Sequence, residues 1–137
     1  MNCLLDTHAF LWAAFAPNKL SARARKEIRS AENRICLSTV SFWEISLKYA
    51  MGKIELENCQ PDDMPAIAAQ MHIEIIPPTA QETASFHRLP KLKHPELKQK
   101  DPFDRMIIWQ AIQQPLVLIS KDSEFPEYKK FGLKVIW

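Results

Sequence analysis

The chain has 137 residues, of which 47% are apolar and 25% are charged, and its formal net charge at pH 7 is +2. This composition is typical of a globular protein with one hydrophobic core, and we expect a single domain over residues 1–137. No apolar run approaches the ~18 residues that a membrane span needs, so we expect a cytoplasmic protein with no membrane segment. A net charge this small does not by itself indicate a nucleic-acid partner.

The first half of the chain alternates short apolar stretches with stretches of helical character. Strands are predicted at residues 2–6 and 35–38, and helices at residues 7–16, 20–33 and 41–53. Ser21 is the expected N-cap of the second helix. Ser41 is a possible N-cap of the third, which would make Glu44, three residues later, its partner in a capping box.

The second half of the chain continues this alternation. Helices are predicted at residues 62–71, 80–89 and 102–114, and strands at residues 73–76, 116–120 and 133–137. Thr79 and Glu82 form a capping-box pattern at the start of one helix. Asp101, directly before Pro102, is a favoured N-cap for the last helix.

Strands that alternate with helices indicate βαβ units and a parallel sheet. The stretch "LVLI" at residues 116–119 is apolar on both faces, as a central parallel strand should be. We therefore expect an α/β fold, namely a three-layer α/β/α sandwich around a parallel sheet of roughly five strands, with right-handed crossovers.

Four acidic residues fall where this topology brings strand ends and helix starts to one edge of the sheet. Asp6 follows the first strand and Asp122 the fourth, while Glu44 and Asp104 are expected in the first turns of two helices. Each has a simpler interpretation, as an N-cap, a capping-box partner or a complement to a helix dipole. Four independent caps need not meet at one edge, so we favour a shared site.

Four carboxylates in a partly desolvated cleft repel one another, so such a site needs a cation. Mg²⁺ prefers oxygen ligands and is suited to phosphodiester chemistry. With only two glycines the chain has no glycine-rich phosphate loop, and the spacing of Cys3, Cys36 and Cys59 fits neither a disulfide framework nor a zinc site. Cys3 and Cys36 are expected in the core. His8 is expected on the first helix as a packed or solvent-facing residue rather than as a base.

Four stretches occur in register along the chain: "LLDTHAFLW", "SFWEISLKYAMGKI", "DPFDRMIIWQA" and "LISKDSEF". Together they resemble the PIN-domain ribonucleases, and most closely the VapC-type toxins of bacterial toxin–antitoxin pairs, over essentially the whole chain. The resemblance implies an endoribonuclease that depends on Mg²⁺ or Mn²⁺, acts on RNA and is inhibited by a cognate antitoxin protein. It also implies a metal-binding and catalytic quartet of Asp6, Glu44, Asp104 and Asp122, supported by the hydroxyl of Ser120.

Other residues near this quartet have expected supporting roles. Asp101 is mainly a helix cap, and a role in the outer shell of the metal stays open. Arg105 is expected to pair with a nearby acid, with a phosphate contact as the alternative. In the basic loop at residues 90–100, four lysines are candidates for contacts to RNA phosphates, namely Lys91, Lys93, Lys98 and Lys100.

Several partners and functions remain open at this point. The apolar stretch "FLWAAFA" at residues 10–16 is expected to contribute to a homodimer or to an antitoxin groove, although core packing explains much of it. A noncatalytic PIN-like module that binds RNA or protein is one alternative function, and a structure-specific DNA nuclease is another. A phosphoacceptor receiver domain is disfavoured, because the third strand is followed by "PPT" rather than by an aspartate.

Overall fold

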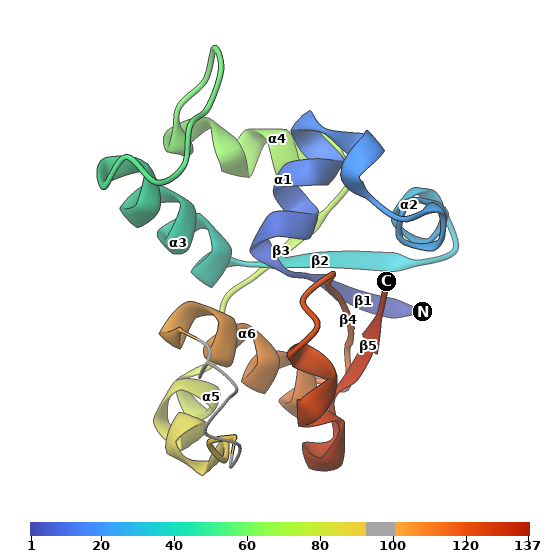
Figure 1. Ribbon diagram of the computed structural model, residues 1–137, viewed down its shortest axis with the longest axis vertical. Helices are drawn as coiled ribbons and strands as arrows, with labels where there is room; N and C mark the ends of the chain where they lie inside the picture. The colour runs from blue at the N-terminus through green and yellow to red at the C-terminus, as the bar shows by residue number, and fades with distance from the viewer. Residues whose placement is uncertain (93–100) are drawn as a thin grey trace.

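In the computed structural model, which describes residues 1–92 and 101–137, a parallel sheet of five strands runs through the middle of the molecule (Figure 1). The strands lie in the order β3-β2-β1-β4-β5, and every neighbouring pair is parallel. Their bounds are Asn2–Leu5 for β1, Arg34–Ser38 for β2, Glu74–Ile76 for β3, Val117–Ile119 for β4 and Lys134–Ile136 for β5. The expected α/β architecture with about five parallel strands is confirmed.

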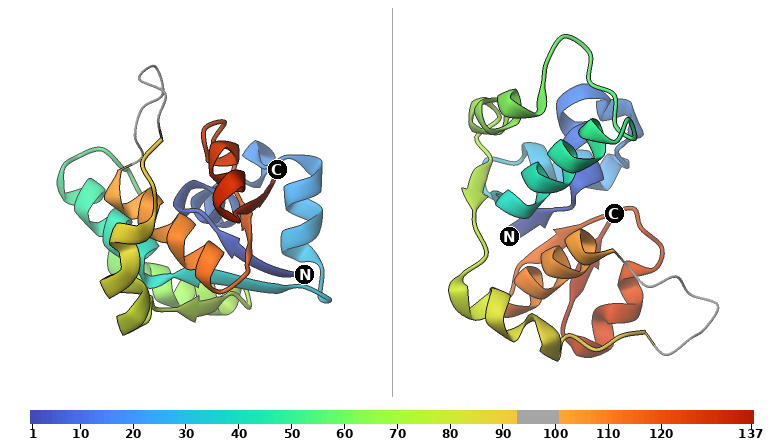
Figure 2. Two further views of the ribbon diagram at one scale, coloured as in Figure 1. Left: turned by 90° about the horizontal axis from the view of Figure 1, so that it is seen from below. Right: turned by 90° about the vertical axis from the view of Figure 1, so that its left-hand side faces the viewer.

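Helices cover both faces of this sheet, as Figures 1 and 2 show. One layer contains α1 (Thr7–Phe15), α2 (Ala22–Arg29), α3 (Thr39–Ala50) and α4 (Met64–Gln70). The other contains α5 (Ala80–Ser85), α6 (Pro102–Gln113) and the 3₁₀ segment η4 (Phe125–Phe131), which the sequence did not predict. There are three shorter 3₁₀ segments in the described part of the chain. Pro17–Lys19 lies between two predicted helices, whereas Pro61–Asp63 and Phe86–Arg88 overlap predicted helices.

The sheet separates two hydrophobic clusters because successive side chains of a strand point to opposite faces. In β1, Cys3 and Leu5 pack with α1 to α4, whereas Leu4 packs with α6 and η4. In β2, Cys36 lies on the same side as Leu4. Both cysteines are fully buried, and burial raises the pKa of each thiol above its usual value. The prediction that these two residues serve the core is confirmed.

The predicted caps of three helices are confirmed. The Ser21 hydroxyl accepts from the backbone N–H of Ala24 at 3.0 Å, and Asp101 caps α6. Thr79 and Glu82 form a reciprocal capping box at 3.0 and 3.2 Å. None of the helices in the described part of the chain combines the length and apolar character that crossing a bilayer requires.

The predicted start of α3 is wrong. The helix begins at Thr39, directly after β2, and its N-cap is Ser38, whose hydroxyl accepts from the N–H of Val40 at 3.1 Å. Ser41 is a buried residue of the first turn, and there is no Ser41–Glu44 capping box. Glu44 consequently lies in the second turn of α3, not in the first.

Candidate functional site

A cleft of about 470 Å³ opens where β1 and β4 end, at the point where the strand order reverses. In open parallel sheets this switch point is the usual place for ligands. All four predicted carboxylates line the cleft: Asp6, Glu44, Asp104 and Asp122. The other lining residues are His8, Trp12, Lys48, Lys121, Ser123 and Phe125.

Asp6 is both the N-cap of α1 and a residue of the cleft, so the predicted cap and the predicted place at the sheet edge are compatible. Its backbone N–H donates to the carbonyl of Ile119 at 3.2 Å, and its carboxylate accepts from the N–H of Ala9 at 2.7 Å. Burial raises the pKa of the Asp6 carboxyl, and the charge of Asp122 adds to this, whereas hydrogen bonds from Ser120 and Ala9 act in the opposite direction. The negative charge of Asp122 therefore acts on the Asp6 carboxyl, and both residues line the same cleft.

Glu44 presents a nearly buried carboxylate from α3, with 1% of the residue exposed. Its Oε1 accepts from the Thr7 hydroxyl at 2.6 Å, and the hydroxyls of Thr7 and Ser41 are hydrogen-bonded to each other at 3.0 Å. Its Oε2 forms an ion pair with Lys48, one helical turn further along. A buried charge is tolerated only with such partners, and the contacts to Thr7 and Lys48 hold the Glu44 carboxylate in one position.

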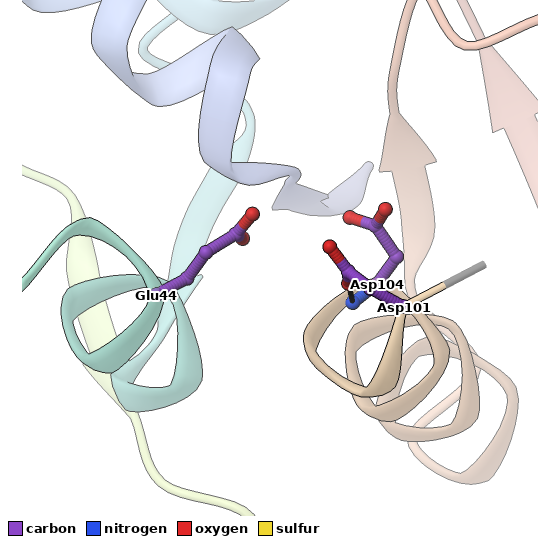
Figure 3. A group of neighbouring side chains, drawn as sticks. All are labelled: Glu44, Asp101 and Asp104. Atoms are coloured by element: carbon purple, nitrogen blue, oxygen red, sulfur yellow. Dashed lines mark hydrogen bonds between the residues drawn. The ribbon is translucent and has the colours of Figure 1, made fainter. Parts of the chain in front are cut away.

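Asp101 and Asp104 come from the start of α6 and face Glu44 across the cleft, as Figure 3 shows. Asp101 Oδ1 accepts from the N–H of Asp104 at 2.8 Å, which confirms the predicted cap, and Asp101 Oδ2 lies 3.4 Å from Lys48 Nζ. One carboxylate oxygen from each of the three acids lies within 4.8 Å of the others. Asp101 is therefore both the cap of α6 and a member of a cluster of three acids.

The segment after β4 positions Asp122 through its own backbone. The Ser120 hydroxyl, which is buried, accepts from the N–H of Asp122 at 3.1 Å, and Asp122 Oδ1 accepts from the N–H of Glu124 at 2.9 Å. Asp6 and Asp122 line the same cleft but are not part of the close three-acid cluster that the described residues form. The four predicted acids thus share one cleft without being equally close.

Arg105 does not have the acid partner that we expected, as far as residues 1–92 and 101–137 show. Its guanidinium donates to the carbonyl oxygens of Leu89 at 2.6 Å and Pro90 at 3.3 Å, and it lies over the ring of Phe86 at 5.1 Å. Arg105 therefore connects α6 to residues 86–90, which follow α5. Lys91 is exposed, and the other three lysines of the predicted RNA contact, Lys93, Lys98 and Lys100, lie outside the described residues.

Two residues that contact the acids of the cleft were not among the predicted site residues. Lys48 contacts both Glu44 and Asp101, and Thr7 holds Glu44. The first has a recognisable signal, because a glutamate and a lysine four residues apart share one helix face. The second follows directly after Asp6, but nothing in the local pattern indicates that its hydroxyl reaches α3.

The donor set fits a hard divalent cation. Every acid of the cleft offers carboxylate oxygens, the ligands that Mg²⁺ prefers. The cleft also attracts positive charge: burial alone lowers the pKa of Lys48, but its hydrogen bonds and ion pairs with Glu44 and Asp101 outweigh burial and raise it. The carboxylates of Glu44 and Asp101 therefore stabilise the positive charge of Lys48.

Comparisons with known proteins agree with this architecture. A family model described as "PIN domain" matches residues 3–131. Ribonuclease VapC22 of Mycobacterium tuberculosis (strain ATCC 25618 / H37Rv) is 24% identical over 134 residues, which cover 98% of this chain and 97% of that protein.

Solved structures show the same fold at low identity. A chain from VapBC2 of Rickettsia felis, bound to a DNA fragment from its promoter, superposes with a TM-score of 0.71 at 21% identity, covering 100% of this chain and 99% of the other. A chain from VapBC-1 of nontypeable Haemophilus influenzae superposes with a TM-score of 0.63 at 19% identity, covering 99% and 97%. At these identities the likeness concerns the fold.

Proposed function

Because the chain belongs to the PIN domain family, we propose that it is an endoribonuclease that hydrolyses RNA phosphodiester bonds with the help of Mg²⁺ or Mn²⁺. We further propose that residues 1–137 form one nuclease domain. The observation that carries this proposal is the cleft at the switch point, where four carboxylates from four separate segments converge. A structural role as helix caps does not explain why all four line one cleft.

In this proposal Asp6, Glu44, Asp104 and Asp122 hold the cation and form the catalytic centre. When bound, the cation would polarise a phosphoryl oxygen of the substrate and lower the pKa of a bound water. The chain itself supplies rigid placement of the ligands. Glu44 is held by Thr7, and Asp122 by the hydrogen bonds around Ser120. Asp101 supports the same centre, since it fixes the first turn of α6 through the N–H of Asp104.

Substrate binding is proposed to use positive charge next to this cleft. Lys121 lines the cleft directly, and its ammonium lies 5.7 Å from the ring centre of Trp12. The lysines predicted to contact RNA phosphates follow α5 and precede α6, and Lys91 is the one among the described residues. Contacts of this kind raise affinity without reading sequence.

We also propose that the protein is the toxin of a type II toxin–antitoxin pair and that it forms a homodimer. Ribonuclease VapC22 and the VapBC structures support this assignment. Exposed apolar side chains give protein partners surface to cover. In the stretch at residues 10–16, Phe10 is buried but Phe15 is 46% exposed beside a second cleft, and Trp43 on α3 is 64% exposed.

The test is incubation of the purified protein with a pool of structured RNAs and Mg²⁺, followed by mapping of the fragment ends. We expect cleavage at defined internal positions and none when EDTA replaces Mg²⁺. Hairpin and flap DNAs in parallel reactions test the alternative of a structure-specific DNA nuclease. RNA binding without cleavage in any cation would instead favour a noncatalytic module and contradict the proposal.

A further inference from the structure

Lys48 connects the two helices that carry the three-acid cluster. It lies on α3, and its ammonium forms ion pairs with Glu44 of the same helix and with Asp101 at the start of α6. We propose that Lys48 is an internal counter-cation, which holds these carboxylates together when no divalent cation is bound and competes with that cation when one is present. This inference rests on the metal site of the proposed function.

The charges around Lys48 explain why the metal-free site needs a cation. The Glu44 side chain is only 2% exposed, while those of Lys48 and Asp101 are 25% and 37% exposed. A nearly buried carboxylate that loses its partner destabilises the fold strongly. Lys48 therefore stabilises the metal-free protein through Glu44 in particular.

The geometry of the carboxylates does not depend on Lys48 alone. Without it, Glu44 would keep the 2.6 Å hydrogen bond from Thr7, and Asp101 would keep the 2.8 Å bond from the N–H of Asp104. Removing the ammonium should therefore remove one positive charge while leaving the ligand atoms in place. The effect on a bound cation is then mainly electrostatic.

The sign of that effect follows from Coulomb's law. The positive charge of Lys48 lies beside Glu44, a proposed ligand, and beside Asp101, which belongs to the same three-acid cluster. It therefore repels a divalent cation and occupies a carboxylate oxygen of Glu44 that the cation needs. At such short range, and with screening by the partly exposed surroundings, loss of the lysine charge should tighten cation binding roughly ten-fold. If Lys48 served only to join α3 to α6, its loss would have the opposite effect. The carboxylates would be held less firmly, and the affinity for the cation would fall.

The experiment compares Lys48→Met, Lys48→Arg and the wild type by calorimetric titration with Mn²⁺ at fixed ionic strength. Lys53→Met is the matched control, since Lys53 is exposed beyond the end of α3 and its loss changes net charge equally. We expect Lys48→Met to bind Mn²⁺ roughly ten-fold more tightly, and Lys48→Arg and Lys53→Met to stay close to the wild type.

Thermal unfolding of the same four proteins supplies an independent readout. In EDTA, Lys48→Met should melt at a lower temperature than the wild type, and saturating Mn²⁺ should remove most of that difference. Equal or weaker Mn²⁺ binding by Lys48→Met would overturn the inference while leaving the metal site intact. If the wild type and all variants fail to bind Mn²⁺, the metal site of the proposed function is wrong and the inference falls with it.

Discussion

The hydroxyl of Thr7 donates a hydrogen bond of 2.6 Å to Oε1 of Glu44, a residue 37 positions further along the chain. Both side chains are buried, and the bond joins the first turn of α1 to the second turn of α3. Hydrogen bonds to charged groups are stronger than those between neutral groups. The acid of α3 is therefore oriented by the residue that directly follows Asp6.

Replacing Thr7 with valine keeps the shape of the side chain but removes the donor to Glu44. We expect the free energy of unfolding to fall by about 1.5–3 kcal/mol, because the lost hydrogen bond involves a charged group in a buried place. RNA cleavage should fall with it, since Glu44 would no longer be held. Urea denaturation and a cleavage assay measure the two effects.

Two further variants separate this bond from general packing in the same region. Thr7→Ser keeps the hydroxyl and should retain most of the stability and activity. Ser41→Ala leaves the Thr7–Glu44 bond intact and should have a smaller effect than Thr7→Val. A Thr7→Val protein as stable and as active as the wild type would show that Glu44 does not depend on this bond.

Asp104→Asn is the most direct test of the catalytic assignment. The change keeps the size of the side chain but removes one carboxylate from the cluster with Glu44 and Asp101. The cap of α6 should persist, because Asp101 accepts from the backbone N–H at position 104 and not from its side chain. We expect RNA cleavage to collapse while the circular dichroism spectrum stays native. Cleavage at the wild-type rate would show that Asp104 is not part of the catalytic centre.

The fold and the presence of the acids at one edge of the sheet could be predicted, because both follow from the alternation of strands and helices along the chain. Apolar strands that alternate with helices indicate a parallel sheet, and in a parallel sheet the residues after each strand share one edge. For this reason the positions of Asp6 and Asp122 in the cleft could be predicted from the sequence. The Asp101 cap could be predicted as well, since an aspartate directly before a proline is a local indication of a helix start.

The parts that could not be predicted depend on contacts between distant segments. Three hydroxyl residues, Ser38, Thr39 and Ser41, lie near the start of α3, and the local pattern does not decide which one caps it. The hydroxyl of Ser41 is instead bonded to Thr7 on α1. Lys48 has the spacing of an ordinary surface pair with Glu44, and only the packing of α6 against α3 brings Asp101 to it.

The proposed RNA contact of the basic loop can be tested by its salt dependence. Changing Lys91, Lys93, Lys98 and Lys100 to alanine should weaken RNA binding and flatten the slope of log affinity against log salt, because fewer counterions are released. The measurement is fluorescence anisotropy of labelled RNA, with Asp104→Asn as the background so that the RNA stays intact.

A charge-matched variant controls for the general loss of positive charge. Four exposed basic residues at and near α2 can be replaced together by alanine: Lys19, Arg23, Lys26 and Arg29. They belong to the other basic stretch of the sequence, and we expect their loss to leave the salt slope close to that of the wild type. Equal slopes in the loop variant and the wild type would show that the loop does not contact RNA.

Binding of a metal ion should change the stability of the fold. Burial is the main cause that raises the pKa of the Asp6 carboxyl, and the charge of Asp122 raises it further, so the two carboxylates repel in the metal-free protein. Asp122→Asn relieves that repulsion, and the asparagine Oδ1 can still accept from the N–H of Glu124. In EDTA this variant should therefore be as stable as the wild type or more stable, and it should gain little from added cation.

The wild type should behave differently, because a cation that binds only the folded state stabilises it by RT ln(1 + [L]/Kd), or about 2.7 kcal/mol at a hundredfold excess over Kd. For a domain of this size the melting temperature should rise by several degrees in millimolar Mn²⁺. NaCl at matched ionic strength controls for screening, and Asp62→Asn, an exposed aspartate outside the cleft, controls for the substitution itself. If Asp122→Asn gains as much from Mn²⁺ as the wild type and Asp62→Asn do, then Asp122 does not belong to the metal site.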